Sequence, residues 1–223
     1  SNLIAAAGTI AINAGNGVGN SASIIQGDLA AEIRAQNVNL TATASVGGVT
    51  DPNNVAAPRN AALTVNLTGP LGGGSIFEGD LIADRTSGAT GPRAGAGALS
   101  ASAGNGNVEI ISRSDLTVDQ VTASGDVTNG QGEVNLFSFA SIDGVDQDAR
   151  IQAARVNLTS LSGSVGGTAD GAQLRVNTAY DASANDREFG DPALNSGLRT
   201  NPYNGVSVTA AGDIGIRSDN WSE

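Results

Sequence analysis

The sequence predicts an all-β protein that winds into a parallel β-helix, also called a β-solenoid, with loop insertions. Three observations support this fold class. Short segments alternate apolar and polar residues, turns rich in Gly and Asn separate them, and similar segments recur in the same order along the chain. No window shows the periodic apolar stripe that a helix of useful length needs.

Ten segments are predicted to be strands because every second residue is apolar, which gives each strand one apolar and one polar face. Turn residues such as Gly15-Asn16-Gly17 bound nearly all of these segments. In chain order the predicted strands are residues 9–14, 38–42, 63–67, 108–110, 116–118, 134–136, 156–158, 174–176, 206–208 and 214–216.

An internal repeat relates the two halves of the chain. Residues 33–41 (IRAQNVNLT) and 151–159 (IQAARVNLT) are identical at six of nine positions, and a Val-Gly-Gly triplet follows each within eight residues. Further strands of the first half have a match in the second half, in the same order. The number of residues between a strand and its match decreases along the chain, so the two halves differ in the length of their loops. We therefore expect residues 1–223 to be one continuous segment of a longer protein, containing two related units at about 8–128 and 132–223.

A parallel β-helix explains this repeat better than a sandwich or another closed β fold. Like residues stack from coil to coil in a β-helix, and insertions leave at the corners. With ~20–25 residues in each coil, we expect about nine to eleven coils and a rod about 45–50 Å long. The expected core comprises Ile10, Ile12, Val38, Leu40, Val108, Ile110, Val134, Leu136, Val156, Leu158, Val206, Val208, Ile214 and Ile216.

The composition excludes several classes of function. The chain has 223 residues, no Cys, Met, His or Lys, and 11 Arg against 22 acidic residues, which gives a formal net charge of −11. Without Cys or His, disulfides, thiolate metal sites and Ser-His-Asp triads are excluded. The acidic balance argues against nucleic acid as a partner, and no apolar run is long enough for membrane insertion.

One acidic cluster is a weak candidate for a calcium site. Asp143, Asp146 and Asp148 place three carboxylates within six residues, and hard oxygen ligands of this kind suit Ca²⁺. The segment lacks the full spacing and the bidentate Glu of an EF-hand loop. A solvated acidic corner is the favoured interpretation, so we predict no cofactor and keep Ca²⁺ as an alternative.

A long insertion at residues 180–203 is the favoured partner-binding loop, because function concentrates on loops over a rigid scaffold. Paired carboxylates there could also serve a glycosidase or a polysaccharide lyase. The charged residues in question are Asp181, Asp186, Arg187, Glu188, Asp191 and Arg199.

Asn39, Asn66, Asn157 and Asn220 match the glycosylation sequon. The first three recur within predicted strands. We interpret them as outward polar residues, which on successive coils form hydrogen-bonded ladders.

The strand Val-Asn-Leu-Thr-Ala followed by Ser-Val-Gly-Gly, and the Gly-Asn-Val-Glu-Ile step that leads into residues 115–127, resemble the repeat regions of filamentous haemagglutinin-type adhesins of bacteria. The resemblance covers nearly the whole chain. It implies a right-handed β-helix, export to the cell surface or the medium, and a role in adhesion or matrix building. It implies no catalytic residue.

The function we expect is therefore a non-enzymatic, extracellular structural or adhesive shaft. Its expected partners are neighbouring copies or adjacent segments of the same chain, together with glycans or surface proteins. A carbohydrate-active β-helix enzyme and a calcium-stabilised module of a secreted toxin are the alternatives.

Overall fold

A computed structural model of the chain describes residues 2–15, 22–26, 31–47, 62–67, 97–125, 131–146, 148–167, 173–178 and 205–218. These residues form strands, turns and bends and contain no helix, so the all-β prediction is confirmed. The strands are β1 (Leu3–Ala14), β2 (Ile33–Ala42), β3 (Leu63–Leu67), β4 (Leu99–Ala103), β5 (Val108–Ser112), β6 (Leu116–Ala123), β7 (Glu133–Ser138), β8 (Ile142–Gly144), β9 (Arg150–Gln152), β10 (Arg155–Ser160), β11 (Leu174–Asn177), β12 (Gly205–Thr209) and β13 (Ile216–Ser218).

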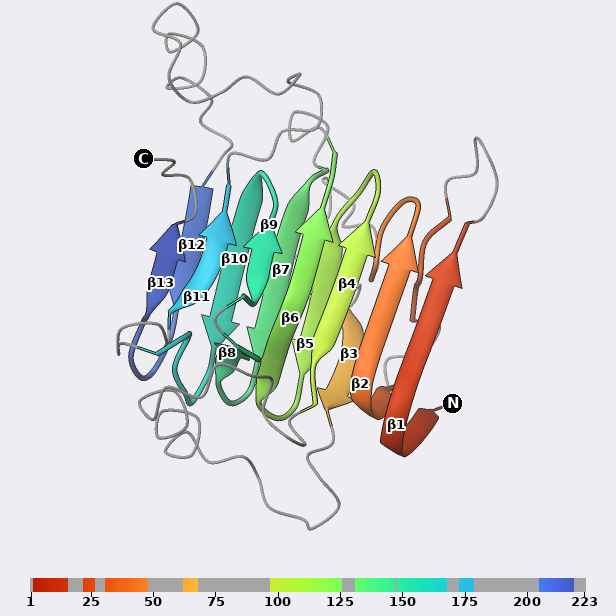
Figure 1. Cartoon of the computed structure of the whole chain (residues 1–223), viewed down its shortest axis with the longest axis horizontal. Helices are drawn as coiled ribbons and strands as arrows, with labels where there is room; N and C mark the ends of the chain where they lie inside the picture. Colours follow the sequence, from red (N-terminus) through yellow and green to blue (C-terminus); the bar gives the residue numbers. More distant parts are fainter. Residues whose placement is uncertain are drawn as a thin grey trace, which may run out of the picture.

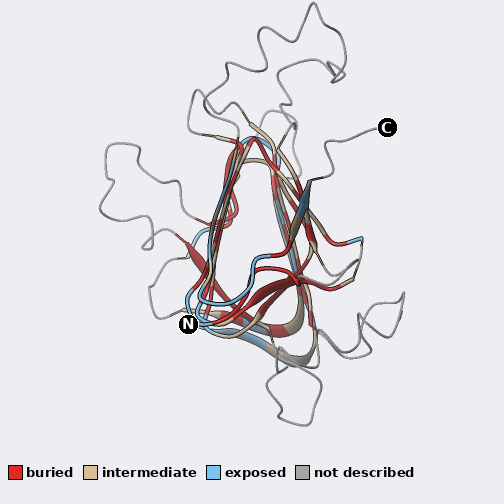
Figure 2. Ribbon diagram, turned by 90° about the vertical axis from the view of Figure 1, so that its left-hand side faces the viewer, coloured by how far each residue is buried: buried red, intermediate tan, exposed pale blue. Residues whose placement is uncertain are grey.

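Every pairing between these strands is parallel. Eleven strands follow one hydrogen-bonded path in the order β12-β10-β7-β5-β3-β2-β4-β6-β9-β11-β13, while β1 adds to β2 and β8 adds to β6 (Figure 1). Seen along the row of strands, the described chain encloses a roughly triangular outline (Figure 2). The sheet therefore curls around a shared interior, which is the arrangement of a β-solenoid-like fold.

Equivalent aliphatic residues stack along the length of this sheet. One such stack, which we call the valine column, places one residue of each layer directly over the residue of the layer before. Its four middle members are fully buried: Val46, Val108, Val134 and Val156 are each 0% exposed. The column consists of Ile24, Val46, Val108, Val134, Val156 and Val206.

The valine column has six members, and the row β1-β2-β4-β6-β9-β11-β13 has seven, so the described residues form seven layers, fewer than the nine to eleven coils expected. Some layers have the expected length: Asn135 and Asn157 lie in adjacent layers and are 22 residues apart. Others contain long insertions, since Ser45 and Asn107 also lie in adjacent layers but are 62 residues apart. At one strand spacing per layer, seven layers span roughly 29 Å, about three fifths of the expected length.

The predicted core is buried in the middle layers and exposed in the last one. Val108, Ile110, Val134, Leu136 and the other middle members are at most 1% exposed, because a layer covers them on each side. Val206 and Ile214 were also expected in the core but are 43% and 50% exposed. They belong to the final described layer, where no further described layer covers them.

The repeated segments of the two halves do not occupy equivalent columns. Ile33 stacks between Leu3 and Val65, whereas its match Ile151 stacks between Val121 and Val176. Residues 33–41 lie within one strand, β2, whereas the similar residues 151–159 run from β9 through a corner into β10. The division into two units remains a prediction.

Candidate functional site

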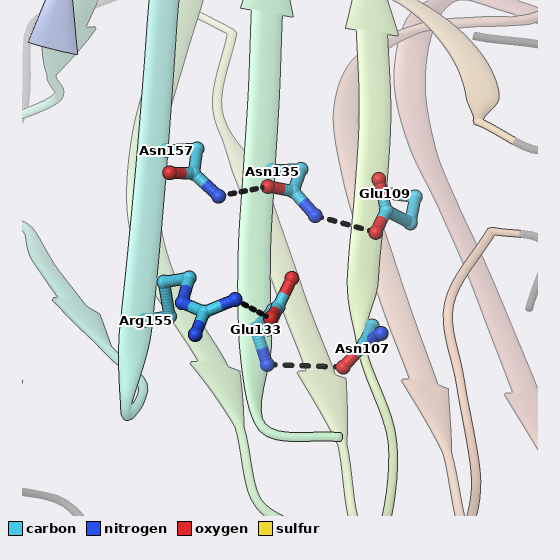
Figure 3. A network of polar contacts seen from close by, with 6 residues as sticks. All are labelled: Asn107, Glu109, Glu133, Asn135, Arg155 and Asn157. Carbon is cyan, nitrogen blue, oxygen red and sulfur yellow. Dashed lines mark hydrogen bonds and ion pairs between the residues drawn. The ribbon is translucent and has the colours of Figure 1, made fainter. Parts of the chain in front are cut away.

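Outward side chains of β5, β7 and β10 form a polar ladder across three layers (Figure 3). Glu109, Asn135 and Asn157 lie in register, since each follows a buried valine of the valine column. The amide nitrogen of Asn157 donates to the amide oxygen of Asn135 at 2.6 Å. The amide nitrogen of Asn135 donates in turn to Glu109 Oε1 at 2.5 Å. Because the strands are in parallel register, one side chain from each layer joins a continuous chain of hydrogen bonds.

A second row of contacts runs beside this ladder. The guanidinium of Arg155 lies 2.6 Å from Glu133 Oε1, and the backbone N–H of Glu133 donates to Asn107 Oδ1 at 3.0 Å. The two charged side chains are 35% and 16% exposed. The ion pair is therefore partly desolvated, and it joins the same layers as the amide ladder.

Glu109 is the buried end of the ladder. Its side chain points away from the apolar interior, yet the residue is only 3% exposed. Gly47 is its neighbour in the preceding layer and has a backbone φ of 91°. A Cβ at Gly47 would collide with the backbone oxygen and the Cβ of Glu109. Glycine is thus required there both by the left-handed conformation and by the close approach of Glu109.

Burial raises the pKa of the Glu109 carboxyl from 4.5 to about 7. The hydrogen bond from Asn135 acts in the opposite direction because it favours the ionised form, and the nearby charge of Glu133 adds to the rise. Near neutral pH the carboxyl is therefore partly protonated. The group is almost fully buried, and through Asn135 it links two layers.

Small polar side chains complete the hydrogen bonding at the corners. Ser45 Oγ accepts the backbone N–H of Asn107 at 3.2 Å, one layer further on. At another corner, Ser141 Oγ accepts the N–H of Ser164 at 3.3 Å, and Ser164 Oγ accepts the N–H of Asp213 at 2.9 Å. Each side chain thus supplies an acceptor for a backbone donor of the next layer.

The three acidic residues considered for calcium lie at the corner that begins with β8. Asp143 Oδ1 accepts the backbone N–H of Gly144 at 2.8 Å, and Asp146 Oδ1 accepts that of Asp148 at 2.8 Å. These bonds close a local turn. Within the described part of the chain, no three acidic side chains gather closely enough to hold a metal ion. Calcium binding here remains an untested alternative.

The predicted partner-binding loop cannot be placed. Asp181, Asp186, Arg187, Glu188, Asp191 and Arg199 all lie outside the described residues.

The expected ladder of outward polar residues includes one of the sequon asparagines, Asn157. A second, Asn66, lies elsewhere in the fold, where its amide nitrogen donates to Glu32 at 2.5 Å and its Oδ1 accepts the N–H of Arg113 at 3.0 Å. The sequence pattern does not single out Glu109, Glu133 or Arg155. Alternation places all three facing outward, but it does not indicate which outward residues are buried.

Among the described residues there is no helix that is long and apolar enough to cross a membrane. Comparisons with protein-family models, with curated proteins and with solved structures each found no match to this chain. The resemblance to filamentous haemagglutinin-type adhesins therefore remains a prediction from the sequence.

Proposed function

We propose that the chain is a right-handed parallel β-helix and that it serves as a non-enzymatic structural shaft of an extracellular or surface-exposed bacterial protein. The single observation that supports this most is the valine column, in which layers repeat along one axis and the last described member, Val206, is 43% exposed. Right-handedness is proposed because crossovers between parallel strands of one sheet are right-handed in about 98% of cases.

The first strand supports a shaft that accepts further layers. β1 spans twelve residues, Leu3–Ala14, with no charged residue and no proline, and it pairs only with β2 among the described strands. Soluble proteins usually protect such an edge with charges, proline or a covering segment. Leu3 and Ile4 are 49% and 60% exposed at this edge.

Two strands, β12 and β13, form the opposite end of the described sheet. β12 also lacks charge and proline and pairs only with β10 among the described strands, whereas β13 carries one charged residue, Arg217, and pairs only with β11. Val206 ends the valine column there, and Ile24 begins it at the other end. A second copy stacked head to tail would place Ile24 over Val206 and continue the column. We therefore propose that the partner at each end is a further parallel layer, supplied in solution by another copy of the chain.

Sedimentation velocity over a range of concentrations, with electron microscopy of the same samples, tests this proposal. We expect rods that lengthen with concentration by whole multiples of one chain. The substitution Ile4→Lys should block this lengthening, because it places a charge on the exposed edge of β1.

Leu161→Lys is the matched control, since Leu161 is 56% exposed but lies at a corner outside the terminal strands. It should leave the rods unchanged. A chain that stays monomeric at every concentration, or rods that Leu161→Lys shortens as much as Ile4→Lys does, would contradict head-to-tail stacking.

A further inference from the structure

The tripeptide Asn-Leu-Thr occurs in two strands of the coil with the same orientation. Asn39-Leu40-Thr41 lies in β2, and Asn157-Leu158-Thr159 lies in β10. Both leucines are 1% exposed and face the core, so the Asn and the Thr of each copy face outward. Asn-X-Thr is the acceptor sequence for N-linked sugars. The two copies therefore form a matched pair in which the surroundings differ and the tripeptide does not.

The asparagine in β10 is committed to the polar ladder. Its amide nitrogen donates to Asn135 at 2.6 Å, toward β7 (Figure 3). A sugar on this nitrogen would compete with the ladder for the space between the two strands. Asn66, which also begins an Asn-X-Thr sequence, is 8% exposed and uses both its amide nitrogen and its Oδ1 in hydrogen bonds. Neither side chain offers room for a sugar in the folded chain.

Asn39 has different surroundings. It is exposed, and no hydrogen bond joins its side chain to another residue in the described part of the chain. β2 lies between β1 and β4 (Figure 1), where the register neighbours of Asn39 are two small residues, Ala11 and Ser100. Ala11 is exposed, and Ser100 Oγ donates to Asp119 at 2.8 Å, in the layer beyond. A group on the Asn39 nitrogen therefore extends into solvent without displacing a hydrogen bond.

The threonine of the same tripeptide is also accessible. Thr41 is exposed, and its register neighbours are the polar residues Asn13 and Ser102. Thr159 in the matched copy is only partly exposed and lies beside Phe137 of β7. Both groups that define the acceptor sequence, the amide and the hydroxyl, are thus open on one face of β2.

From this placement we propose that Asn39 is an N-glycosylation site of the protein. In the transfer, the amide nitrogen of Asn39 forms a bond to C1 of a sugar. The bond between C1 and a phosphate oxygen of the activated donor breaks, the leaving phosphate keeps the electron pair, and the amide proton passes to a base of the transferase. The donor class is a nucleotide-linked or lipid-linked sugar phosphate. The inference goes beyond the proposed shaft, because it does not depend on how chains stack.

The fold also indicates when the sugar is added and which sites keep it. The backbone around Asn39 is paired with β1 on one side and with β4 on the other, so a transferase reaches the tripeptide before these layers form. A sugar added at that stage to Asn66 or Asn157 would prevent the contacts described above. A sugar on Asn39 stays outside the coil. Folded chains should therefore carry the sugar on Asn39 and not on Asn66 or Asn157.

The test is peptide mass spectrometry of the folded protein isolated from the cells that make it. We expect the peptide that contains Asn39 to be heavier by whole sugar residues, and the peptides that contain Asn66 and Asn157 to be unmodified. A single added sugar identifies a nucleotide-linked donor, and a preassembled oligosaccharide identifies a lipid-linked donor. Thr41→Val should abolish the added mass. Because the Thr41 side chain is exposed, the variant should keep the urea midpoint of the wild type.

The matched control is Thr159→Val, which makes the same change in the other copy of the tripeptide and should leave the mass at Asn39 unchanged. The proposal is overturned if Asn39 carries no sugar, if the added mass persists in Thr41→Val, or if folded chains carry a sugar on Asn157. Rods built from chains with an unmodified Asn39 would contradict the glycosylation site alone, and monomers with a modified Asn39 would contradict the shaft alone.

Discussion

The side-chain amide of Asn135 donates a hydrogen bond to the carboxylate of Glu109, 2.5 Å away in the preceding layer. This contact joins two layers through side chains as well as through the backbone. It also fixes a carboxyl group in a buried position, where burial raises its pKa to about 7. The stability of this part of the coil therefore depends on pH.

We predict that Glu109→Gln removes a pH-dependent loss of stability. The pKa of Glu109 is raised from 4.5 to about 7 in the folded chain, so the folded state binds more protons than the unfolded state between these values. The contribution of Glu109 is therefore fully favourable below about pH 4.5, declines as the pH rises, and is lost above about pH 7. The loss is at most about 3 kcal/mol for a shift of this size.

Urea unfolding of the wild type and of Glu109→Gln between pH 4.5 and 8.5 measures this difference. The amide still accepts the hydrogen bond from Asn135 but does not ionise, so the variant should gain stability relative to the wild type as the pH rises. Parallel pH profiles for the two proteins would show that Glu109 titrates normally.

A methyl group at Gly47 should be costly. The φ of 91° disfavours any residue with a Cβ, and the new atom would meet the backbone of Glu109. We expect Gly47→Ala to lower the free energy of unfolding by roughly 2–4 kcal/mol. Gly205→Ala is the control, because a Cβ at Gly205 meets no atom within 4 Å. It should change stability by no more than about 0.5 kcal/mol. Equal effects of the two changes would mean that the contact between Gly47 and Glu109 is not close.

Two isoleucines of one column test the difference between middle and terminal layers. Ile142 and Ile214 both stack on Val165, from opposite sides, but Ile142 is fully buried and Ile214 is 50% exposed. Ile142→Ala leaves a cavity and should cost about 2–5 kcal/mol, whereas Ile214→Ala should cost less than about 1 kcal/mol in the monomer. Chemical denaturation at low protein concentration measures both.

The same pair reports on stacking. When a second copy covers the last layer, Ile214 becomes buried, so Ile214→Ala should then weaken assembly in sedimentation experiments. A large loss of monomer stability from Ile214→Ala would show instead that this end is already covered.

The middle layers could be predicted from the sequence because alternation is a local property. Val134, Asn135 and Leu136 reveal their inward and outward directions within three residues, and the structure places them as expected. The number of layers could not be predicted in this way. Periodicity identifies strands, but it does not distinguish a coil of ordinary length from one that contains a long insertion.

A row of three arginines across β9, β11 and β13 is invisible in the sequence for a related reason. Arg150, Arg175 and Arg217 are separated by 25 and 42 residues, so a search for a basic cluster along the chain does not find them. Only the register of β9, β11 and β13 brings them together. The burial of Glu109 likewise depends on the neighbouring layer at Gly47, which no local pattern specifies.

The corner hydroxyls should contribute more than their size suggests. Ser45 is 6% exposed, and its Oγ accepts the backbone N–H of Asn107, which is 4% exposed. Ser45→Ala removes this acceptor from a buried N–H, and we expect a loss of about 1–3 kcal/mol in the free energy of unfolding. Ser162→Ala provides the comparison, since the exposed Ser162 hydroxyl donates to the carbonyl of Phe139 at 2.6 Å and water can replace it. Amide hydrogen exchange locates the effect: protection should fall at Asn107 in Ser45→Ala and stay unchanged there in Ser162→Ala. Unchanged protection at Asn107 in both variants would mean that the backbone ladder alone holds the layers at this corner, and that serine was not needed as an acceptor.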